Sequence, residues 1–196
     1  MDILTPVTLA GPHARLEPLS PDHCAGLQAA AADGELWKLW YTTIPSAEGM
    51  QVEIERRLGL HAKGTMLPFT VFNADGEVAG MTTFMNVDRV QRRVEIGSTW
   101  YRASSQRTPL NTQCKLLLLT HAFEALDCIA VEFRTHRLNT QSRRAIERLG
   151  AQLDGILRAH QRMPDGTLRD TAVYSITANE WPTVKTHLQW QLIKPR

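Results

Sequence analysis

The sequence predicts an α/β protein of the mixed (α+β) kind, with a central sheet of about seven strands and helices on both faces. Three observations support this fold class. Short apolar runs bounded by turn residues alternate with segments of helical periodicity along the 196 residues. Residues 67–101 carry successive turn signals between apolar runs, which predicts adjacent antiparallel strands. Residues 95–134 then read as strand, helix and strand, which predicts a parallel or splayed pair with a right-handed crossover.

The composition indicates one globular domain over residues 1–196, with a last helix from about residue 179. No run reaches the roughly 18 apolar residues of a membrane span, and the first ten residues lack a signal-peptide pattern. We therefore expect a cytoplasmic protein without a membrane partner. The net charge of +2 gives little support to a nucleic-acid partner. The cysteines, at positions 24, 114 and 128, show no metal-ligand spacing and indicate reduced packing residues, with no metal.

The first third of the chain predicts one bent strand and two helices. Residues 7–19 alternate apolar and polar side chains around Gly11-Pro12. Ser20 before Pro21 is a helix start, and this helix should end near residue 32. A second helix is expected from residue 46 to about residue 63. Between the two helices lie three aromatic residues, Trp37, Trp40 and Tyr41.

The remaining elements follow from turn residues. Residues 67–72 and 78–84 flank Asn73-Ala-Asp-Gly76, a strong hairpin signal, and a third strand follows the charged turn at 88–93. An apolar helix (112–126), a strand (128–134), a helix from Asn139 to Gly150 and two strands (152–163 and 168–177) come next. The last helix has enough apolar surface to need a partner. Its own sheet is the simpler choice and a homodimer is the alternative.

The loop before the apolar helix is rich in hydrogen-bond donors, namely Gln106, Arg107, Thr108, Asn111, Thr112 and Lys115. Unpaired amides and the positive end of the helix dipole favour an anion at such a helix start. The same residue types also cap a buried helix, so both interpretations stay open. His121, within the apolar helix, has no second metal-type residue at matching spacing, and we interpret it as a core histidine.

Four motifs together resemble the GCN5-related N-acetyltransferase (GNAT) family, in particular its RimJ/RimL-like branch. They are Gln106-Arg-Thr-Pro-Leu-Asn111, Asn139-Thr-Gln-Ser142 with Gly150, Glu95-Ile-Gly97, and Arg158 with Arg169-Asp-Thr-Ala-Val-Tyr174. The resemblance extends from residue 7 to residue 177, and its motifs are degenerate singly but specific in combination. It implies a GNAT-like splayed sheet and an enzyme that transfers acetyl from acetyl-CoA (coenzyme A) to a primary amine. The acceptor would be a protein or peptide N-terminus or a small-molecule amine.

The resemblance also assigns roles to residues. Backbone amides of residues 107–112 would hold the pyrophosphate, and Asn139 and Ser142 would contact the pantetheine arm near its thioester. Glu95 is the candidate base, directly or through water, although a solvent-facing or salt-bridged strand carboxylate is the alternative. Ser142 is the candidate acid for the leaving thiolate. The full expected cofactor set is Trp100, Gln106, Arg107, Thr108, Asn111, Thr112, Lys115, Asn139, Ser142 and Arg144.

Two positions depart from the family pattern. Pro109 replaces the glycine of the phosphate loop and removes an N–H donor, and Ile146 stands where many members carry a tyrosine that acts as the acid. A CoA-binding protein without catalysis is therefore an alternative. A DNA-binding regulator, reading DNA through the basic segment 142–148, is a weaker one because a strand precedes that helix. The expected acceptor residues are Trp37, Trp40, Tyr41, Phe84 and Asn86, with core packing as the alternative.

Overall fold

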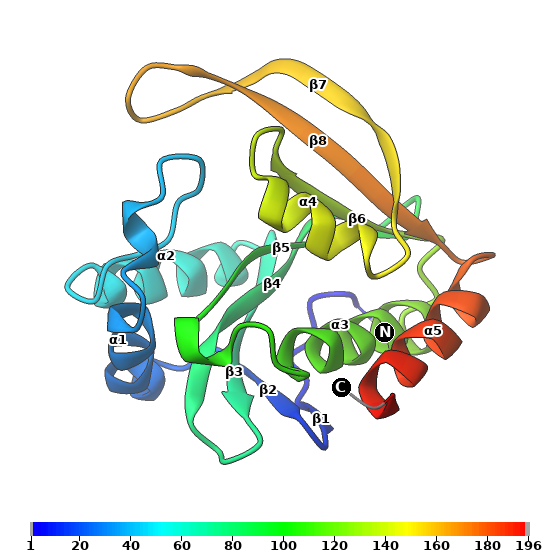
Figure 1. Ribbon diagram of the computed structural model, residues 1–196, viewed down its shortest axis with the longest axis horizontal. Coiled ribbons are helices and arrows are strands. Elements are labelled where there is room, and N and C mark those ends of the chain that lie inside the picture. The colour runs from blue at the N-terminus through cyan, green and yellow to red at the C-terminus, as the bar shows by residue number, and fades with distance from the viewer. Residues whose placement is uncertain (1, 195–196) are drawn as a thin grey trace.

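The computed structural model describes residues 2–194, and its centre is an eight-stranded mixed sheet (Figure 1). The strands are β1 (Leu9–Gly11), β2 (Ala14–Pro18), β3 (Met66–Asn73), β4 (Val78–Asp88), β5 (Arg93–Tyr101), β6 (Ala130–His136), β7 (Gln152–Arg162) and β8 (Leu168–Thr177). Their spatial order is β1-β2-β3-β4-β5-β6-β8-β7. The predicted fold class is confirmed. The strand count exceeds the expected number because residues 7–19 form two paired strands instead of one bent strand.

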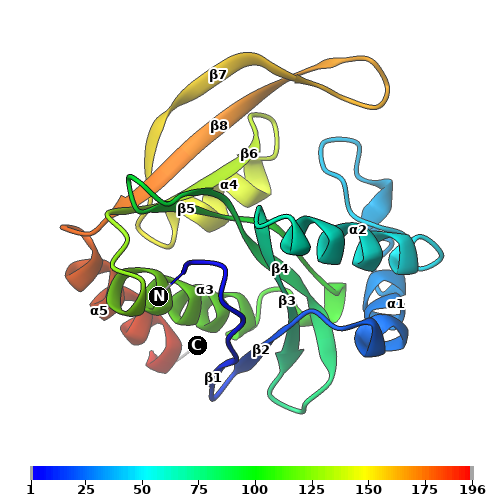
Figure 2. The same ribbon diagram turned by 180° about the vertical axis from the view of Figure 1, so that it is seen from behind.

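Five α-helices accompany the sheet in the described part of the chain: α1 (Cys24–Ala32), α2 (Met50–Ala62), α3 (Leu110–Thr120), α4 (Thr140–Glu147) and α5 (Trp181–Ile193). A single π-helical turn, His121–Ala125, extends α3. Helices α1 and α2 lie on one side of the sheet, and α3 and α5 lie on the other (Figures 1 and 2). Within residues 2–194 no helix is long and apolar enough to cross a membrane.

Two hydrophobic clusters hold these layers together. The larger cluster joins α3 and α5 to the sheet and includes Leu118, Phe84 and Leu188. The smaller cluster lies under α1 and α2 and includes Ile54 and Trp100. Helix α5 buries Trp181, Val184 and Leu188 within the same chain, whereas Trp190 is exposed; a homodimer stays a prediction.

Helix α2 begins at Met50, four residues later than the sequence predicted. The Ser46 hydroxyl instead accepts a hydrogen bond from the Gly49 amide and closes a separate turn before the helix. Two of the other predictions held closely. The hairpin at Asn73 forms, with Asn73 Oδ1 accepting from the amides of Asp75 and Glu77, and α4 begins directly after its cap, Asn139.

Strand β5 is paired with β6 over only three positions. The parallel pairs are Arg93 with Ala130, Val94 with Val131 and Glu95 with Glu132. Beyond Glu95 the two strands run apart, as the sequence predicted, while β5 stays paired with β4 as far as Tyr101. The edge of β5 from residue 96 onward is therefore open toward β6.

A bulge interrupts β5 just after this divergence. Gly97 pairs with Thr83 and Trp100 pairs with Met81, so Ser98 and Thr99 together oppose the single residue Thr82. Ser98 has a φ of 48°, in the left-handed region. The extra residue reverses the alternation of side chains that follows, which turns Trp100 toward α1 and α2.

Strands β7 and β8 form a long hairpin that arches over β6 and α4 (Figure 2). Strand β7 is the outer edge of the sheet, and almost all of its side chains are partly or fully exposed. Its pairing with β8 shifts register between Leu157 and Gln161, around Ala159, whose φ is 48°. The opposite edge, β1, is only three residues long.

Candidate active site

The divergence of β5 and β6 opens a wedge within the sheet, and the starts of α3 and α4 flank it (Figure 1). On the open side of β5, backbone N–H and C=O groups from residue 96 onward have no strand beside them. Such an edge can accept an extended, amide-containing chain as if it were another strand. The wedge is therefore suited to a peptide-like arm such as pantetheine.

The loop at the start of α3 forms a tight turn. Arg107 has a φ of 61° and lies at the surface. The Thr108 hydroxyl donates to the Ser105 carbonyl (2.7 Å) and accepts from the Leu110 amide (3.3 Å), so Thr108 satisfies the first amide of α3 from the position before the cap residue, Pro109. Further amides of the first turn have no acceptor within the helix and favour an anion. Anion binding by Arg107, Thr108 and Asn111 stays a prediction.

Two side-chain bonds join the two sides of the wedge. Gln106 Nε2 donates to the carbonyl of Tyr101, at the end of β5, and Gln106 Oε1 accepts from Gln141 of α4 (3.4 Å). One turn into α3, the Thr112 hydroxyl accepts from Arg148, just beyond α4 (3.2 Å). The loop before α3 is thus tied to the start of α4, and the first turn of α3 to the end of α4; Thr112 is buried.

The start of α4 brings Asn139 and Ser142 together. Asn139 Oδ1 accepts from the Ser142 amide (3.0 Å), which is the usual bond of a helix cap. Ser142 is half-buried and Arg144 is exposed, while Ile146 packs into the main core. Because the capping bond uses Asn139 Oδ1, the side-chain groups that can bind a ligand here are the Asn139 amide nitrogen and the Ser142 hydroxyl.

Glu95 is the most informative titratable group of the site. Its side chain is buried, and Oε2 accepts from Asn86 Nδ2 (2.7 Å). Burial raises the pKa of this carboxyl, and the Asn86 hydrogen bond and the Arg134 charge only partly oppose the rise. The two predicted site residues Glu95 and Asn86 are therefore in direct contact. A carboxylate with a raised pKa is better matched to accepting a proton from an amine.

A row of charges continues from Glu95 across β6. Arg134 Nε lies 3.5 Å from Glu95 Oε2 but is not aligned for a hydrogen bond, whereas Arg134 Nη2 donates to Glu132 (2.9 Å). Glu132 also accepts from Arg93 (2.5 Å). Arg134 is thus bonded mainly to Glu132 and only loosely paired with Glu95. This leaves Glu95 without a tight cationic partner that would hold its pKa down.

The sequence prediction missed Glu132, Arg134 and His136, although a signal was present. They alternate with apolar residues along residues 130–136, so they share one face of β6. Polar side chains on one face of a strand inside a sheet indicate that this face is not covered by core. The structure has a groove of about 530 Å³ there, lined by β6, β8 and β7.

Gly97 makes room for the Glu95 carboxylate. A Cβ atom at Gly97 would lie 2.7 Å from Glu95 Oε1 and 2.8 Å from Met85 Sδ. Gly97 also pairs with Thr83 immediately before the bulge. The absence of a side chain at Gly97 therefore leaves the space that the Glu95 carboxylate occupies.

The side chains of two residues of the expected cofactor set are buried away from the open edge. Trp100 is buried in the cluster under α1 and α2. Lys115 is buried between α3 and β5, where Nζ donates to Thr99 Oγ1 (3.1 Å). Burial lowers the pKa of Lys115 to about 8. A role of either residue in cofactor binding stays a prediction.

The expected acceptor residues divide into two groups. Trp40 is exposed and packs edge-on against Tyr41 (5.6 Å between ring centroids) and His136 (5.3 Å). This loop therefore reaches the same face of β6 that carries Arg134. Phe84, in contrast, is completely buried against His121 on the α3 side. Trp37 is half-buried in the short 3₁₀ turn Leu36–Lys38.

Residues 2–194 contain no cluster of three or more His, Cys, Asp or Glu side chains that could hold a metal ion. His121, the histidine interpreted as a core residue, is indeed buried, and burial lowers its pKa. Two of the arginines in and just beyond α4 also have partners within the chain. Arg143 donates to the Tyr174 hydroxyl (2.8 Å), and Arg148 is bonded to Thr112.

Comparison with known proteins gives consistent matches. Residues 13–152 match the family model described as an acetyltransferase (GNAT) domain. A candidate ribosomal N-acetyltransferase of Bacillus subtilis (strain 168), YdaF, is 32% identical over 107 residues, which are 55% of this chain and 57% of that protein. The match thus spans little more than half the length of this curated relative.

Solved structures match over nearly the whole chain. A candidate acetyltransferase from T. thermophilus is 34% identical, with a TM-score of 0.84 over 96% of this chain and 98% of that one. Mycobacterium smegmatis RimJ in complex with CoA-disulfide has the same fold, with a TM-score of 0.82 over 97% of each chain at 23% identity. These similarities agree with the resemblance found in the sequence motifs.

Proposed function

The chain belongs to the GNAT acetyltransferase family, and from this premise we propose that it is an N-acetyltransferase that transfers acetyl from acetyl-CoA to the N-terminal amine of a protein or peptide. The observation that carries the proposal is the buried Glu95 carboxylate beside the open edge of β5. It combines an edge for a peptide-like arm with a group able to accept a proton.

In the proposed reaction, acetyl-CoA supplies an activated thioester. The open edge of β5 binds the arm that carries it, and the start of α3 binds its phosphates. Glu95 removes a proton from the attacking ammonium, directly or through water, because only a neutral amine is nucleophilic. A new C–N bond forms as the C–S bond breaks. The Ser142 hydroxyl gives a proton to the departing sulfur and regains one from the nitrogen, which loses its second proton as it becomes the amide.

The acceptor class rests on the groove beside Glu95. It follows β6, β8 and β7, and its polar lining includes Arg93, Glu132, Arg134 and Asp154. An open groove with both charge signs suits an extended polar chain better than a small enclosed amine. The ribosomal role in the name of YdaF supports the same class of acceptor.

The test is an acceptor screen with release of free CoA thiol as the readout. One set holds peptides with varied free N-termini, and a second set holds the same peptides with blocked N-termini and an internal lysine. A third set holds small amines. We expect turnover with free N-termini and none with their blocked counterparts.

Each other outcome contradicts a different part of the proposal. Turnover with small amines alone removes the peptide acceptor. Calorimetric binding of acetyl-CoA without turnover across all three sets supports a CoA-binding protein without catalysis. Absence of acetyl-CoA binding at micromolar concentration removes the cofactor assignment itself.

A further inference from the structure

Helix α2 carries a buried arginine that the reaction described so far does not use. Arg57 is 2% exposed and lies on the helix side that faces the sheet, one and two turns beyond the buried Ile54 and Met50. An apolar residue is expected at such a position. A guanidinium there loses its hydration, so the chain must replace it with well-placed acceptors.

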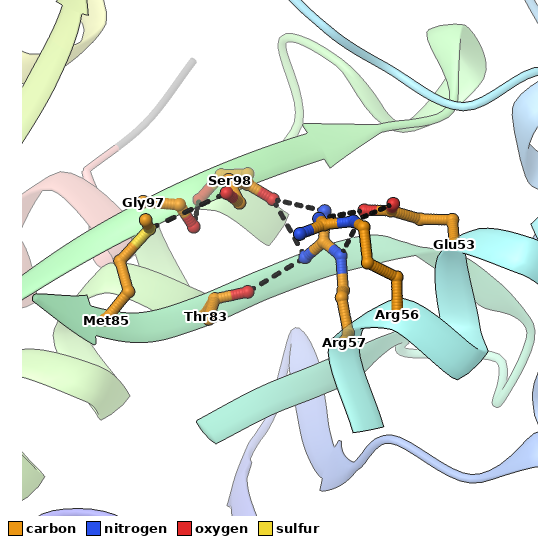
Figure 3. Close-up of polar contacts among 8 residues, drawn as sticks. Glu53, Arg56, Arg57, Thr83, Met85, Gly97 and Ser98 are labelled. Carbon is orange, nitrogen blue, oxygen red and sulfur yellow. Dashed lines mark hydrogen bonds and ion pairs between the residues drawn. The ribbon is translucent and has the colours of Figure 1, made fainter. Parts of the chain in front are cut away.

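The structure supplies those acceptors (Figure 3). Arg57 Nε donates to Glu53 Oε1 (2.6 Å), and Nη1 donates to Thr83 Oγ1 of β4 (2.8 Å). Nη1 and Nη2 both donate to the carbonyl oxygen of Ser98 (3.3 and 3.4 Å). Glu53 is also bonded to Arg56 (2.7 and 2.8 Å). Burial opposes ionisation of Glu53, but the two guanidinium groups outweigh it and lower its pKa.

The hydrogen-bond acceptor that Arg57 finds on β5 is the carbonyl of the bulge residue, Ser98. Ser98 is in the left-handed region, which is unfavourable for a residue with a side chain. Its own hydroxyl makes only a weak contact, to Met85 Sδ (3.6 Å). The Ser98 carbonyl, in contrast, is held by two nitrogens of one rigid, planar group. The grip on Ser98 comes three residues beyond Glu95, where the edge of β5 is already open.

We propose that Arg57 is a positioning residue for acetyl transfer, because its grip on the Ser98 carbonyl holds the bulge of β5 in the shape that receives the acyl-bearing arm. The inference rests on the proposed use of acetyl-CoA. An ion pair buried for stability alone is a poor device, since an apolar side chain of similar size serves as well or better. Arg57 instead links α2 to the strained bulge residue of the open strand edge.

The test compares acetyl-CoA affinity by calorimetry for the wild type and three variants. Arg57→Met keeps much of the side-chain volume and leaves Glu53 paired with Arg56. Arg56→Met is the matched control, since Arg56 binds the same Glu53 but is half-exposed. Arg57→Met/Ser98→Gly adds a residue that adopts a positive φ without strain. Thermal unfolding confirms that each protein is folded at the temperature of the titration.

We expect Arg57→Met to weaken acetyl-CoA binding about tenfold, the scale of one unsupported left-handed residue. Arg56→Met should bind as the wild type does, and Ser98→Gly should restore much of the loss in the Arg57→Met background. A merely structural role of Arg57 would lower the unfolding temperature without this pattern of affinities. If Arg57→Met does not fold, Arg57→Lys replaces it, because an ammonium cannot reach Glu53 and Ser98 together.

Equal affinities of the two single variants overturn the inference, and so does a loss that Ser98→Gly leaves unrepaired. A wild type that does not bind acetyl-CoA overturns the proposed function and this inference with it. Wild-type binding with no effect of Arg57→Met overturns only the inference, so the two failures are distinguishable.

Discussion

Glu95, on β5, and Lys115, on α3, have buried side chains on opposite faces of β5, and the surroundings of the two side chains differ. Glu95 has an amide donor, a loosely paired guanidinium and a groove beside it. Lys115 donates a hydrogen bond to a threonine and is enclosed by α3 and β5. Burial moves the pKa of each toward neutrality, upward for Glu95 and downward to about 8 for Lys115.

The comparison teaches that a shifted pKa alone does not identify a site. Burial produces both shifts, but only Glu95 lies on the face with the row of charges and the groove. We therefore expect Glu95 to affect the reaction and Lys115 to affect stability. The following substitutions test this division, in order of decreasing expected effect.

Glu95→Gln should lower kcat/KM for a peptide acceptor by about 10²- to 10³-fold, the usual contribution of a general base, without changing acetyl-CoA affinity. In the wild type, kcat/KM should rise with pH through the raised pKa of Glu95, because the carboxylate is the active form. This rise should be absent in the variant. Steady-state kinetics over a pH series measure both effects.

Asn86→Ala supplies the control for this prediction. The Asn86 hydrogen bond lowers the pKa of Glu95, so removing it should move the rise of kcat/KM to higher pH. A pH profile that ignores both substitutions, or full turnover by Glu95→Gln, would assign Glu95 a purely structural role.

Lys115→Met should raise the free energy of unfolding at pH 7 by up to about 3 kcal/mol, less the lost hydrogen bond. The folded pKa of about 8 lies below the unfolded value, so the unfolded state binds more protons between them. Wild-type stability should therefore increase from pH 8 to about pH 10.4, while that of the variant should not share this rise. Urea unfolding at several pH values measures the difference.

Lys185→Met is the matched control, because Lys185 is paired with Glu124 at the surface. Its loss should change stability by at most about 1 kcal/mol. A fall in acetyl-CoA affinity of Lys115→Met, with the control unaffected, would instead return Lys115 to the cofactor site and end the proposed division.

Gly97→Ala should lower kcat about tenfold with little loss of stability, since an ångström-scale displacement of a reacting group is costly for turnover. The new methyl group would meet the ends of two flexible side chains, Glu95 and Met85, which can move aside. Kinetics and thermal unfolding on the same protein separate the effects. A large drop in stability with unchanged kcat would mean that the glycine serves the backbone alone.

Trp40→Ala should have the smallest effect. Trp40 is 58% exposed and contacts His136 from outside, so its loss should change the free energy of unfolding by less than about 0.5 kcal/mol. If the loop that carries Trp40 borders the bound peptide, the KM for that peptide should still rise about threefold, because a small amount of contact energy is lost. An unchanged KM would limit the acceptor to the groove on β6 and β8.

Local signals predicted most of the fold. The turn at Asn73–Gly76 and the cap at Asn139 were predictable because the responsible bonds lie within a few residues of each other. The divergence of β5 and β6 after Glu95 agrees with the splayed sheet that the family resemblance implied. The side on which Trp100 lies was not predictable, because the bulge at Ser98 reverses the alternation and leaves no mark in the residue types.

Long-range polar partners were equally hidden. The spacing of Arg57 from Ile54 and Met50 places it on the buried side of α2, unlike the exposed Arg56, but its partners on β4 and β5 are visible only in the structure. The Glu95–Asn86 contact was implicit in two separate predictions, but their bond required the antiparallel register of β4 and β5. Residues close together in the sequence therefore indicate the helices, strands and turns, and contacts between strands determine the surroundings of the site residues such as Glu95.

The outer strand β7 bears on whether two copies of the chain can pair edge to edge at high concentration. An eleven-residue edge with free backbone groups could template the addition of a strand from another molecule. Ala159, with its positive φ, breaks the flatness of that edge, and the exposed Arg162 places a charge on it, while Arg158 is paired with Asp170. The irregular hairpin is therefore a poor template for pairing between two such edges.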